Sequence, residues 1–279
     1  MKSRRFFLKQ GSLATAAILV TKPFISFAGS IKSIAGINIL ESHISLLHTG
    51  NLYSRFSPVA DNSLYQGLGG FENTGNMIAL LKKRLPNVVL LDAGNHATDK
   101  LLDDTSKQTS TLMQQLGYDA VAATTSHTGV PLIAKNKDGF KIIEKGAIRI
   151  GVISTEAVDN NIASVNELAN NIKADYRCNL IICLSSLGYK KNNADDHALA
   201  ASSKNIDIIL GAADGTFMKT PDIAQNQDKN EVVINHTGYA GIVLGKLDIS
   251  FDEKGNKKAI TFDNLMIGTP NQRWIKPTA

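Results

Sequence analysis

The chain has 279 residues, 43% of them apolar, which is enough for one large domain or two small ones with a hydrophobic core. It carries 30 lysines and arginines against 25 aspartates and glutamates, a formal net charge of +5. No apolar run reaches the ~20 residues that a bilayer-spanning helix needs, so we expect no membrane span in the mature protein.

The first 28 residues have the pattern of a twin-arginine export signal. Arg4 and Arg5 lie in a basic segment, Gly11 to Val20 is apolar, and Ser26-Phe27-Ala28 has small residues where a signal peptidase cuts. The alternative is a basic amphipathic helix. This segment holds five basic residues and no acidic one, so 25 of each sign remain after it. That balance gives no support for nucleic-acid binding. The signal predicts a periplasmic or cell-surface protein.

The rest of the chain shows short apolar runs separated by segments with helical periodicity. Predicted helices are Asn76–Leu85, Thr105–Leu116, Ser164–Ala174 and Ala194–Ser203. Predicted strands are Ile44–His48, Val88–Ala93, Ala120–Ala123, Ile148–Ser154, Leu180–Ser185, Ile206–Gly211, Val232–His236, Ile242–Phe251 and Ala259–Phe262. Strands that alternate with helices indicate a layered α/β fold. Only turns separate the last three strands, so we expect them to be antiparallel.

We find no Pro/Ser-rich linker, low-complexity segment or internal repeat, so residues 29–279 are expected to form a single domain. Cys178 and Cys183 allow one disulfide in an oxidising compartment. Cys183 lies inside an apolar predicted strand, which favours two buried thiols instead.

Small and polar residues follow the predicted strands at their carboxyl ends, where α/β sheets form their active sites. The segments are HTGNLYSR, DAGNH, TTSH, SSLGY and GAADGT, and they are nearly free of carboxylates. Such residues could line a polar site, but they offer few anionic metal ligands.

The order and flanks of these segments resemble the metallophosphoesterase domain of the secreted 5'-nucleotidase family, within the calcineurin-like superfamily. The blocks that carry the resemblance are LLHTGNLYSRF, NVVLLDAGN, LGYDAVAATTSH, LSSLGY and IDIILGAADGT. They span essentially all of the chain after the signal. The resemblance implies an α/β/β/α sandwich and a phosphoester hydrolase that uses two divalent metals.

The resemblance also implies where seven metal ligands and one phosphate-contacting histidine would lie, and all eight positions hold other residues. They are Asn51, Tyr53, Asn95, Thr125, Ser126, Ser186, Ala213 and Gly215. Asn95 stands where an aspartate would bridge both metals, and an amide cannot supply that charge. We therefore expect no metal cofactor and no catalytic residue, that is, a pseudoenzyme that serves as a binding or partner subunit.

Three alternatives remain open. His96 and His127 follow different strands and, with Asn95 and Asp214, could form a rearranged phosphoesterase or nucleotidase site. With His48 or Asp214 they could instead hold one zinc or copper ion, unless they only line a polar pocket. A vacated cavity lined by amides and hydroxyls could also accept a sugar or a nucleoside.

The resemblance implies one further part, a C-terminal nucleotidase domain that grips the nucleoside. The chain reaches Ala279 soon after its last predicted strand. We therefore expect this domain to be absent from the chain and to be supplied by a separate partner chain.

Overall fold

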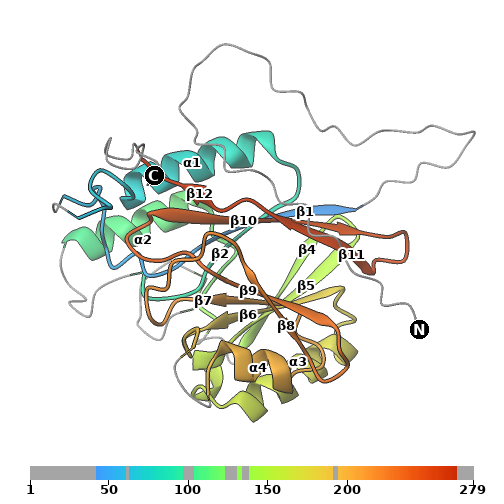
Figure 1. The fold of residues 1–279 in the computed structure, drawn as a ribbon. Helices are drawn as coiled ribbons and strands as arrows, with labels where there is room; N and C mark the ends of the chain where they lie inside the picture. Colours follow the sequence, from blue (N-terminus) through green and yellow to red (C-terminus); the bar gives the residue numbers. More distant parts are fainter. Residues whose placement is uncertain are drawn as a thin grey trace, which may run out of the picture.

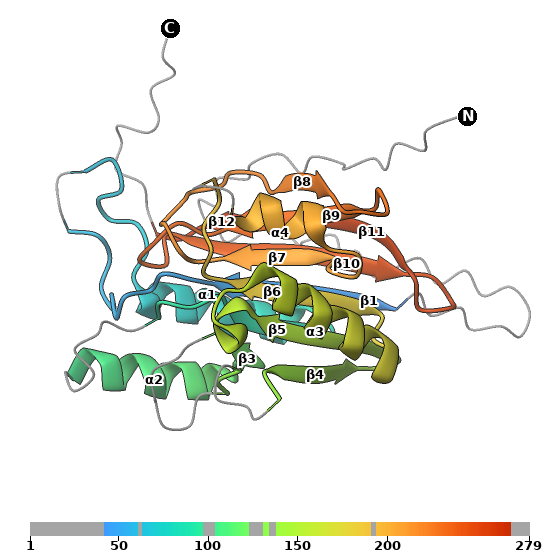
Figure 2. The ribbon, with the colours of Figure 1, turned by 90° about the horizontal axis from the view of Figure 1, so that it is seen from below.

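A computed structural model describes residues 42–60, 63–96, 104–122, 131–133, 138–190 and 194–268. Two β-sheets face each other, and helices cover the outer side of each (Figure 1). The view turned by 90° shows the second helical layer lying across its sheet (Figure 2). The predicted export signal lies outside the described residues.

The first sheet has the strand order β11-β10-β1-β2-β3, with β12 paired to β10. Its strands are β1 (His43–Thr49), β2 (Val88–Asp92), β3 (Ala120–Val121), β10 (Val243–Phe251), β11 (Lys257–Phe262) and β12 (Leu265–Met266). Strands β1, β2 and β3 are parallel, whereas β10 runs antiparallel to β1. The outer face is covered by α1 (Phe71–Arg84) and α2 (Asp104–Leu116).

The second sheet has the order β4-β5-β6-β7-β9-β8. Its strands are β4 (Phe140–Lys145), β5 (Ile148–Ser154), β6 (Leu180–Ser185), β7 (Ile208–Gly211), β8 (Asp222–Gln225) and β9 (Glu231–His236). Strands β5, β6, β7 and β9 are parallel, and β4 and β8 are antiparallel edges. The outer face carries η1 (Thr155–Val158), α3 (Ile162–Asp175) and α4 (Asp196–Ser202).

Alternation along the strands divides the core into layers. Val89 and Leu91 of β2 pack between the sheets, whereas Leu90 packs with residues of α1 and α2. In β6, Ile182 points between the sheets and Ile181 points toward α3 and α4. Because both faces of each sheet are buried, the strands read as nearly continuous apolar runs. The expected α/β/β/α layering is confirmed.

Three details of the predicted elements are wrong. Helix α1 begins at Phe71, whereas the predicted helix begins at Asn76. The edge strands β4 and β8 were not predicted, because their charged and polar residues mask the apolar pattern of a strand. The last three predicted strands are not all antiparallel neighbours. Strand β9 lies in the second sheet, and the turn after it, with positive φ at Gly238, Ala240 and Gly241, carries the chain to β10 in the first.

Cys178 and Cys183 are both free and buried, as the sequence favoured. Within the described ranges, no helix is long and apolar enough to cross a bilayer.

Candidate functional site

The loops that follow β1 and β2 are joined to each other beyond the ends of the strands. The amide N–H groups of Asn51, Tyr53 and Ser54 donate to the carbonyls of Gly94, Asn95 and His96, each at 2.9 Å. Asn51, Tyr53, Ser54 and Asn95 have φ between 50° and 54°. This left-handed backbone is unfavourable for tyrosine and serine and persists only where surrounding bonds hold it. The three bonds therefore fix the side chains that these loops present.

Three of the predicted site residues meet in a group that we call the amide cluster: Asn51, Tyr53 and Asn95. The Asn95 Nδ2 donates to Asn51 Oδ1 at 2.9 Å and to the Ala212 carbonyl at 2.6 Å. The Tyr53 hydroxyl also donates to Asn51 Oδ1, at 3.1 Å, and Asn51 Nδ2 donates to the Gly238 carbonyl at 2.9 Å. The cluster thus joins the ends of β1 and β2 to the loops after β7 and β9.

The other predicted positions lie apart from this cluster or lack polar side chains. Ser186 donates to Asn160 Oδ1 at 2.8 Å and lies 3.2 Å from the Thr155 hydroxyl, so it is held by the segment after β5. Ala213 and Gly215 flank Asp214 and contribute no side-chain donor or acceptor. Thr125, Ser126 and His127 lie outside the described residues.

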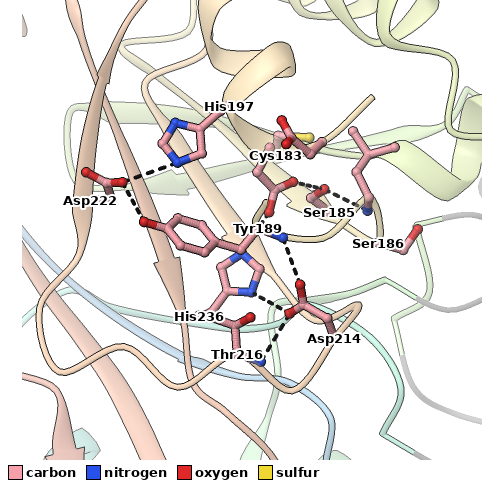
Figure 3. A network of polar contacts seen from close by, with 12 residues as sticks. Cys183, Ser185, Ser186, Tyr189, His197, Asp214, Thr216, Asp222 and His236 are labelled. Atoms are coloured by element: carbon pink, nitrogen blue, oxygen red, sulfur yellow. Dashed lines mark hydrogen bonds and ion pairs between the residues drawn. The ribbon is translucent and has the colours of Figure 1, made fainter. Parts of the chain in front are cut away.

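The buried His236 lies between two carboxylates, Asp196 and Asp214. Figure 3 shows its contact with Asp214. His236, at the end of β9, places Nε2 2.7 Å from Asp196 Oδ2 and Nδ1 3.7 Å from Asp214 Oδ1. The Ser185 hydroxyl donates to the other oxygen of Asp196. His236 and Asp196 are almost fully buried, and together with Ser185 they link α4, β6 and β9.

Asp214 is the most accessible carboxylate of this group. Its side chain is 15% exposed, and its two oxygens accept bonds from the amides of Tyr189 at 2.9 Å and Thr216 at 3.1 Å. Burial alone would raise the pKa of Asp214, but these hydrogen bonds and the nearby His236 outweigh it and lower the pKa below its ordinary value. Asp214 is therefore ionised at neutral pH.

A surface network lies on the far side of Tyr189. The Tyr189 hydroxyl donates to Asp222 Oδ2 at 2.6 Å, and His197 Nε2 lies 3.2 Å from the same oxygen (Figure 3). The Tyr189 ring lies against His197 and His236, with centroids 5.1 Å and 5.7 Å away. Lys190 lies 4.7 Å over the same ring. Tyr189 thus connects the surface network to Asp214.

Three titratable groups, Asp92, His48 and His96, are buried in β1 and β2 or just after β2. Burial raises the pKa of Asp92 to about 7, although bonds from the Thr49 hydroxyl at 2.6 Å and the Gly94 amide at 3.0 Å act in the opposite direction. Burial lowers the pKa of His48 to about 3, and the charge of His236 adds to this effect. His96 is also buried, with Nδ1 3.9 Å from Asp92 Oδ1.

The amide cluster does not fit a two-metal centre. Each metal of such a centre needs lone pairs directed at it, and a bridging ligand must present oxygens to both. Asn95 instead directs N–H groups at Asn51 and Ala212, and Asn51 Oδ1 already accepts two bonds. Within the described residues, no group of three or more histidines, cysteines, aspartates or glutamates is placed to hold a metal ion.

The sequence did not indicate the pairing of Asp196 with His236. Asp196 lies in the predicted helix Ala194–Ser203 and His236 ends the predicted strand Val232–His236, and the structure confirms both elements. The two residues lie 40 positions apart, with no spacing motif between them. Only the packing of α4 against the ends of β7 and β9 brings them together.

The sequence and the structure were both compared with those of known proteins, and both are similar to 5'-nucleotidases. No protein-family model matches the chain. The venom 5'-nucleotidase of Crotalus adamanteus is 24% identical over 274 residues, covering 76% of this chain and 46% of the relative. The 5'-nucleotidase precursor of Thermus thermophilus superposes with a TM-score of 0.66 at 18% identity, over 81% of this chain and 55% of that one.

A shorter solved structure matches over nearly its whole length. The calcineurin-like phosphoesterase YfkN from Bacillus subtilis has a TM-score of 0.57 at 16% identity, covering 83% of this chain and 94% of that one. The chain is homologous to 5'-nucleotidases and has the fold of the calcineurin-like metallophosphoesterases. It spans about half the length of the curated relatives it matches.

Proposed function

We propose that this 5'-nucleotidase homologue is a metal-free, catalytically inactive member that acts as a binding or partner subunit. The observation that carries the proposal is the amide cluster. At positions where the sequence resemblance places two aspartates and a histidine as metal ligands, Asn51, Asn95 and Tyr53 bond to one another. The NH₂ group of Asn95 donates one hydrogen bond to Asn51, which follows a strand of the first sheet, and one to Ala212, which follows a strand of the second. A cation bound between the sheets would otherwise make this link.

The loss of charge explains why hydrolysis is not expected. Phosphoester hydrolysis at such sites relies on two cations to generate the nucleophile and to stabilise the negative transition state. Neutral amides supply neither effect, and the Ser186, Ala213 and Gly215 positions add no imidazole. The fold itself does not depend on a metal at these positions, because the Thr49 hydroxyl is hydrogen-bonded to Asp92 and Tyr118 inside the protein.

An activity assay tests this proposal. The purified chain without residues 1–28 is assayed against a broad panel of phosphomonoesters, phosphodiesters and nucleotides, with added Mn²⁺, Zn²⁺ or Mg²⁺ and with a chelator. We expect no turnover above the buffer rate under any of these conditions. Hydrolysis that a chelator abolishes and a metal restores would contradict the proposal.

A second candidate function is phosphoester hydrolysis through a rearranged site. The homology to 5'-nucleotidases and the burial of His96 beside Asp92 favour it. In this case activity would depend on the imidazole, so a His96→Ala variant would lose the activity, while a surface His43→Ala control would keep it. Equal activity of the two variants would remove this candidate.

We also propose that a separate chain supplies the nucleotidase C-terminal domain. The sequence resemblance implies such a domain beside this fold, and the match covers about half of the curated relatives. Purification of the tagged protein from its native cell envelope should recover a partner with that domain in a stoichiometric complex. Recovery of the chain alone under mild, uncrosslinked and crosslinked conditions would contradict it.

We propose export by the twin-arginine route, on the basis of residues 1–28. The paired substitution of Arg4 and Arg5 by lysine keeps the charge but removes the twin-arginine motif. The variant precursor should accumulate inside the cell. Unchanged export of the variant would show that another route is used.

A further inference from the structure

We propose that residues 269–279 of this chain dock, through Trp274, on a group of aromatic side chains next to the amide cluster. We call this group the aromatic cluster, and it consists of Tyr65, Phe217 and Tyr239. The inference goes beyond the proposed function, because it holds whether or not the site binds metals. It assigns an occupant from the chain itself to an apolar face of the protein.

The aromatic cluster offers a partly exposed apolar surface. The Tyr65 ring packs against Phe217 and Tyr239, with centroids 6.1 Å and 5.9 Å away. All three rings are only partly buried, and they rest on a small hydrophobic core that includes Leu68. The neighbouring Leu64 side chain is 65% exposed. Accessible apolar and aromatic side chains gathered on one face are typical of a surface that binds another polypeptide segment.

The backbone ties the aromatic cluster to the amide cluster. Tyr239 lies between Gly238 and Ala240 in the loop after β9. The Gly238 carbonyl accepts from the Asn51 side chain, and the Ala240 amide donates to the Asn51 carbonyl at 2.9 Å. A β-bridge also holds Phe217 against this loop. A segment that docks on the aromatic cluster therefore borders the candidate site.

The described chain leaves the fold beside the aromatic cluster. After β12, Gly268 forms a β-bridge with Leu68, and the Leu68 amide donates to the Tyr65 carbonyl at 2.9 Å. Gly268 has a φ of 97°, and a Cβ there would lie 2.6 Å from the Gly67 carbonyl oxygen. Glycine is thus required for this close approach. The residues that follow Gly268 begin next to the turn that carries Tyr65.

The sequence of the segment suits this surface. Residues 269–279 read TPNQRWIKPTA, and Trp274 is the single tryptophan of the chain. Trp274 comes six positions after Gly268, a reach of up to about 20 Å for an extended chain. Prolines near both ends of the segment favour an extended backbone over a helix. Tryptophan buries a large apolar area and packs well on the edges and faces of other rings, so it is the natural anchor.

Fluorescence of the single tryptophan tests the proposal. The chain without residues 1–28 is titrated with acrylamide, a neutral quencher, and is compared with the same protein unfolded in urea. We expect the Trp274 emission to lie at shorter wavelength than in urea and its quenching to be several-fold weaker. Tyr65→Ala should remove most of this protection, because it deletes the ring that contacts both other members of the aromatic cluster.

A matched control and a milder variant accompany this measurement. Tyr176→Ala deletes another partly exposed tyrosine, which packs on Phe140 with a centroid distance of 5.1 Å at the end of α3, and it should leave Trp274 protected. Tyr65→Leu keeps an apolar side chain and should raise the quenching by a few fold. It replaces Tyr65→Ala if circular dichroism shows that the alanine variant does not fold.

Three results would overturn the inference. The first is a Trp274 as accessible to acrylamide in the native protein as in urea. The second is protection that Tyr65→Ala and Tyr65→Leu leave unchanged. The third is protection that disappears on dilution, which would place the segment on a second copy of the chain. The measurement depends on neither metal content nor activity, so its failure is distinct from a failure of the proposed function.

Discussion

Asn95 decides, at the scale of single residues, what the ends of β1 and β2 can hold. Its side chain differs from aspartate by one NH₂ group, yet that group directs two hydrogen bonds at oxygen acceptors. A carboxylate in the same place would direct lone pairs at those acceptors and would require a cation between them. The neutral site is thus a complete hydrogen-bonded arrangement, and restoring one acidic residue should harm it.

The first prediction concerns this restoration. Asn95→Asp should destabilise the protein by about 1–3 kcal/mol, because the Asn51 and Ala212 oxygens lose their donor and face a negative charge. Urea unfolding at neutral pH measures the loss. Added Mn²⁺ or Zn²⁺ should not recover it, since among the residues that the structure describes no group of three or more carboxylates, imidazoles or thiols is placed to hold a metal ion.

Asn87→Asp provides a matched control. Asn87 also has positive φ, and its side-chain amide donates one hydrogen bond, to the His43 carbonyl at 3.0 Å. Unlike Asn95, it lies exposed at the opposite end of β2. Its substitution should cost less than about 1 kcal/mol. An Asn95→Asp protein as stable as this control, or stabilised strongly by metal, would contradict the account of the amide cluster.

The second prediction concerns His48 and Asp92, whose pKa values are shifted by burial in opposite directions. Between pH 3.8 and 6.5 the unfolded chain has a charged His48 and a charged Asp92, whereas the folded chain keeps both neutral. Folding therefore excludes a proton at His48, so its contribution to stability falls as the pH falls. Folding takes up a proton at Asp92, so its contribution rises as the pH falls.

Single variants should reveal the two opposing dependences of the unfolding free energy on pH. Relative to the wild type, His48→Gln should become more stable as the pH falls through this window, and Asp92→Asn should become less stable. Urea unfolding at several pH values measures both differences. Parallel stability curves for the wild type and the two variants would show that neither group is shifted as described.

At the scale of elements, two glycines allow histidine rings to lie across neighbouring strands. A Cβ at Gly245 of β10 would overlap the His48 ring of β1, and a Cβ at Gly211 of β7 would overlap the His236 ring of β9. Glycine weakens a strand, and it often marks such a close approach. These positions therefore fix how β1 packs on β10 and how β7 packs on β9.

The third prediction tests the contact between β1 and β10. Gly245→Ala should cost about 1–3 kcal/mol, because the added methyl displaces the buried ring. In a His48→Ala background the same substitution should cost much less, and a double-mutant cycle from thermal or urea unfolding measures this coupling. Equal costs in both backgrounds would rule out the ring as the obstacle.

The elements also show what sequence patterns can and cannot predict. Buried central strands such as β2 and β6 were predicted nearly to the residue, because they are apolar runs with polar residues at the carboxyl end. Edge strands β4 and β8 were missed because one exposed side removes that pattern. The passage of the chain from β9 to β10 depends on a turn with positive φ at Ala240, a residue that does not mark such turns.

At the scale of the whole molecule, the two sheets bring together loops that are far apart in the chain. The sequence predicted that Asn51, Tyr53 and Asn95 belong to one site, because each follows a strand in a block that resembles the 5'-nucleotidase family. It did not predict that Asn51 and Asn95 bond to each other, or that the site reaches Ala212 and Gly238 of other loops. Those contacts arise only when the parallel strand ends of both sheets meet.

The measurement that tests the central claim most directly is the divalent metal content of the mature protein. The protein is purified without chelators, dialysed against buffer containing Mn²⁺ and Zn²⁺ and then against metal-free buffer, and its metals are counted by mass spectrometry. The amide cluster predicts well below one tightly bound ion per chain. Two retained ions per chain, removed only by a strong chelator, would contradict the account.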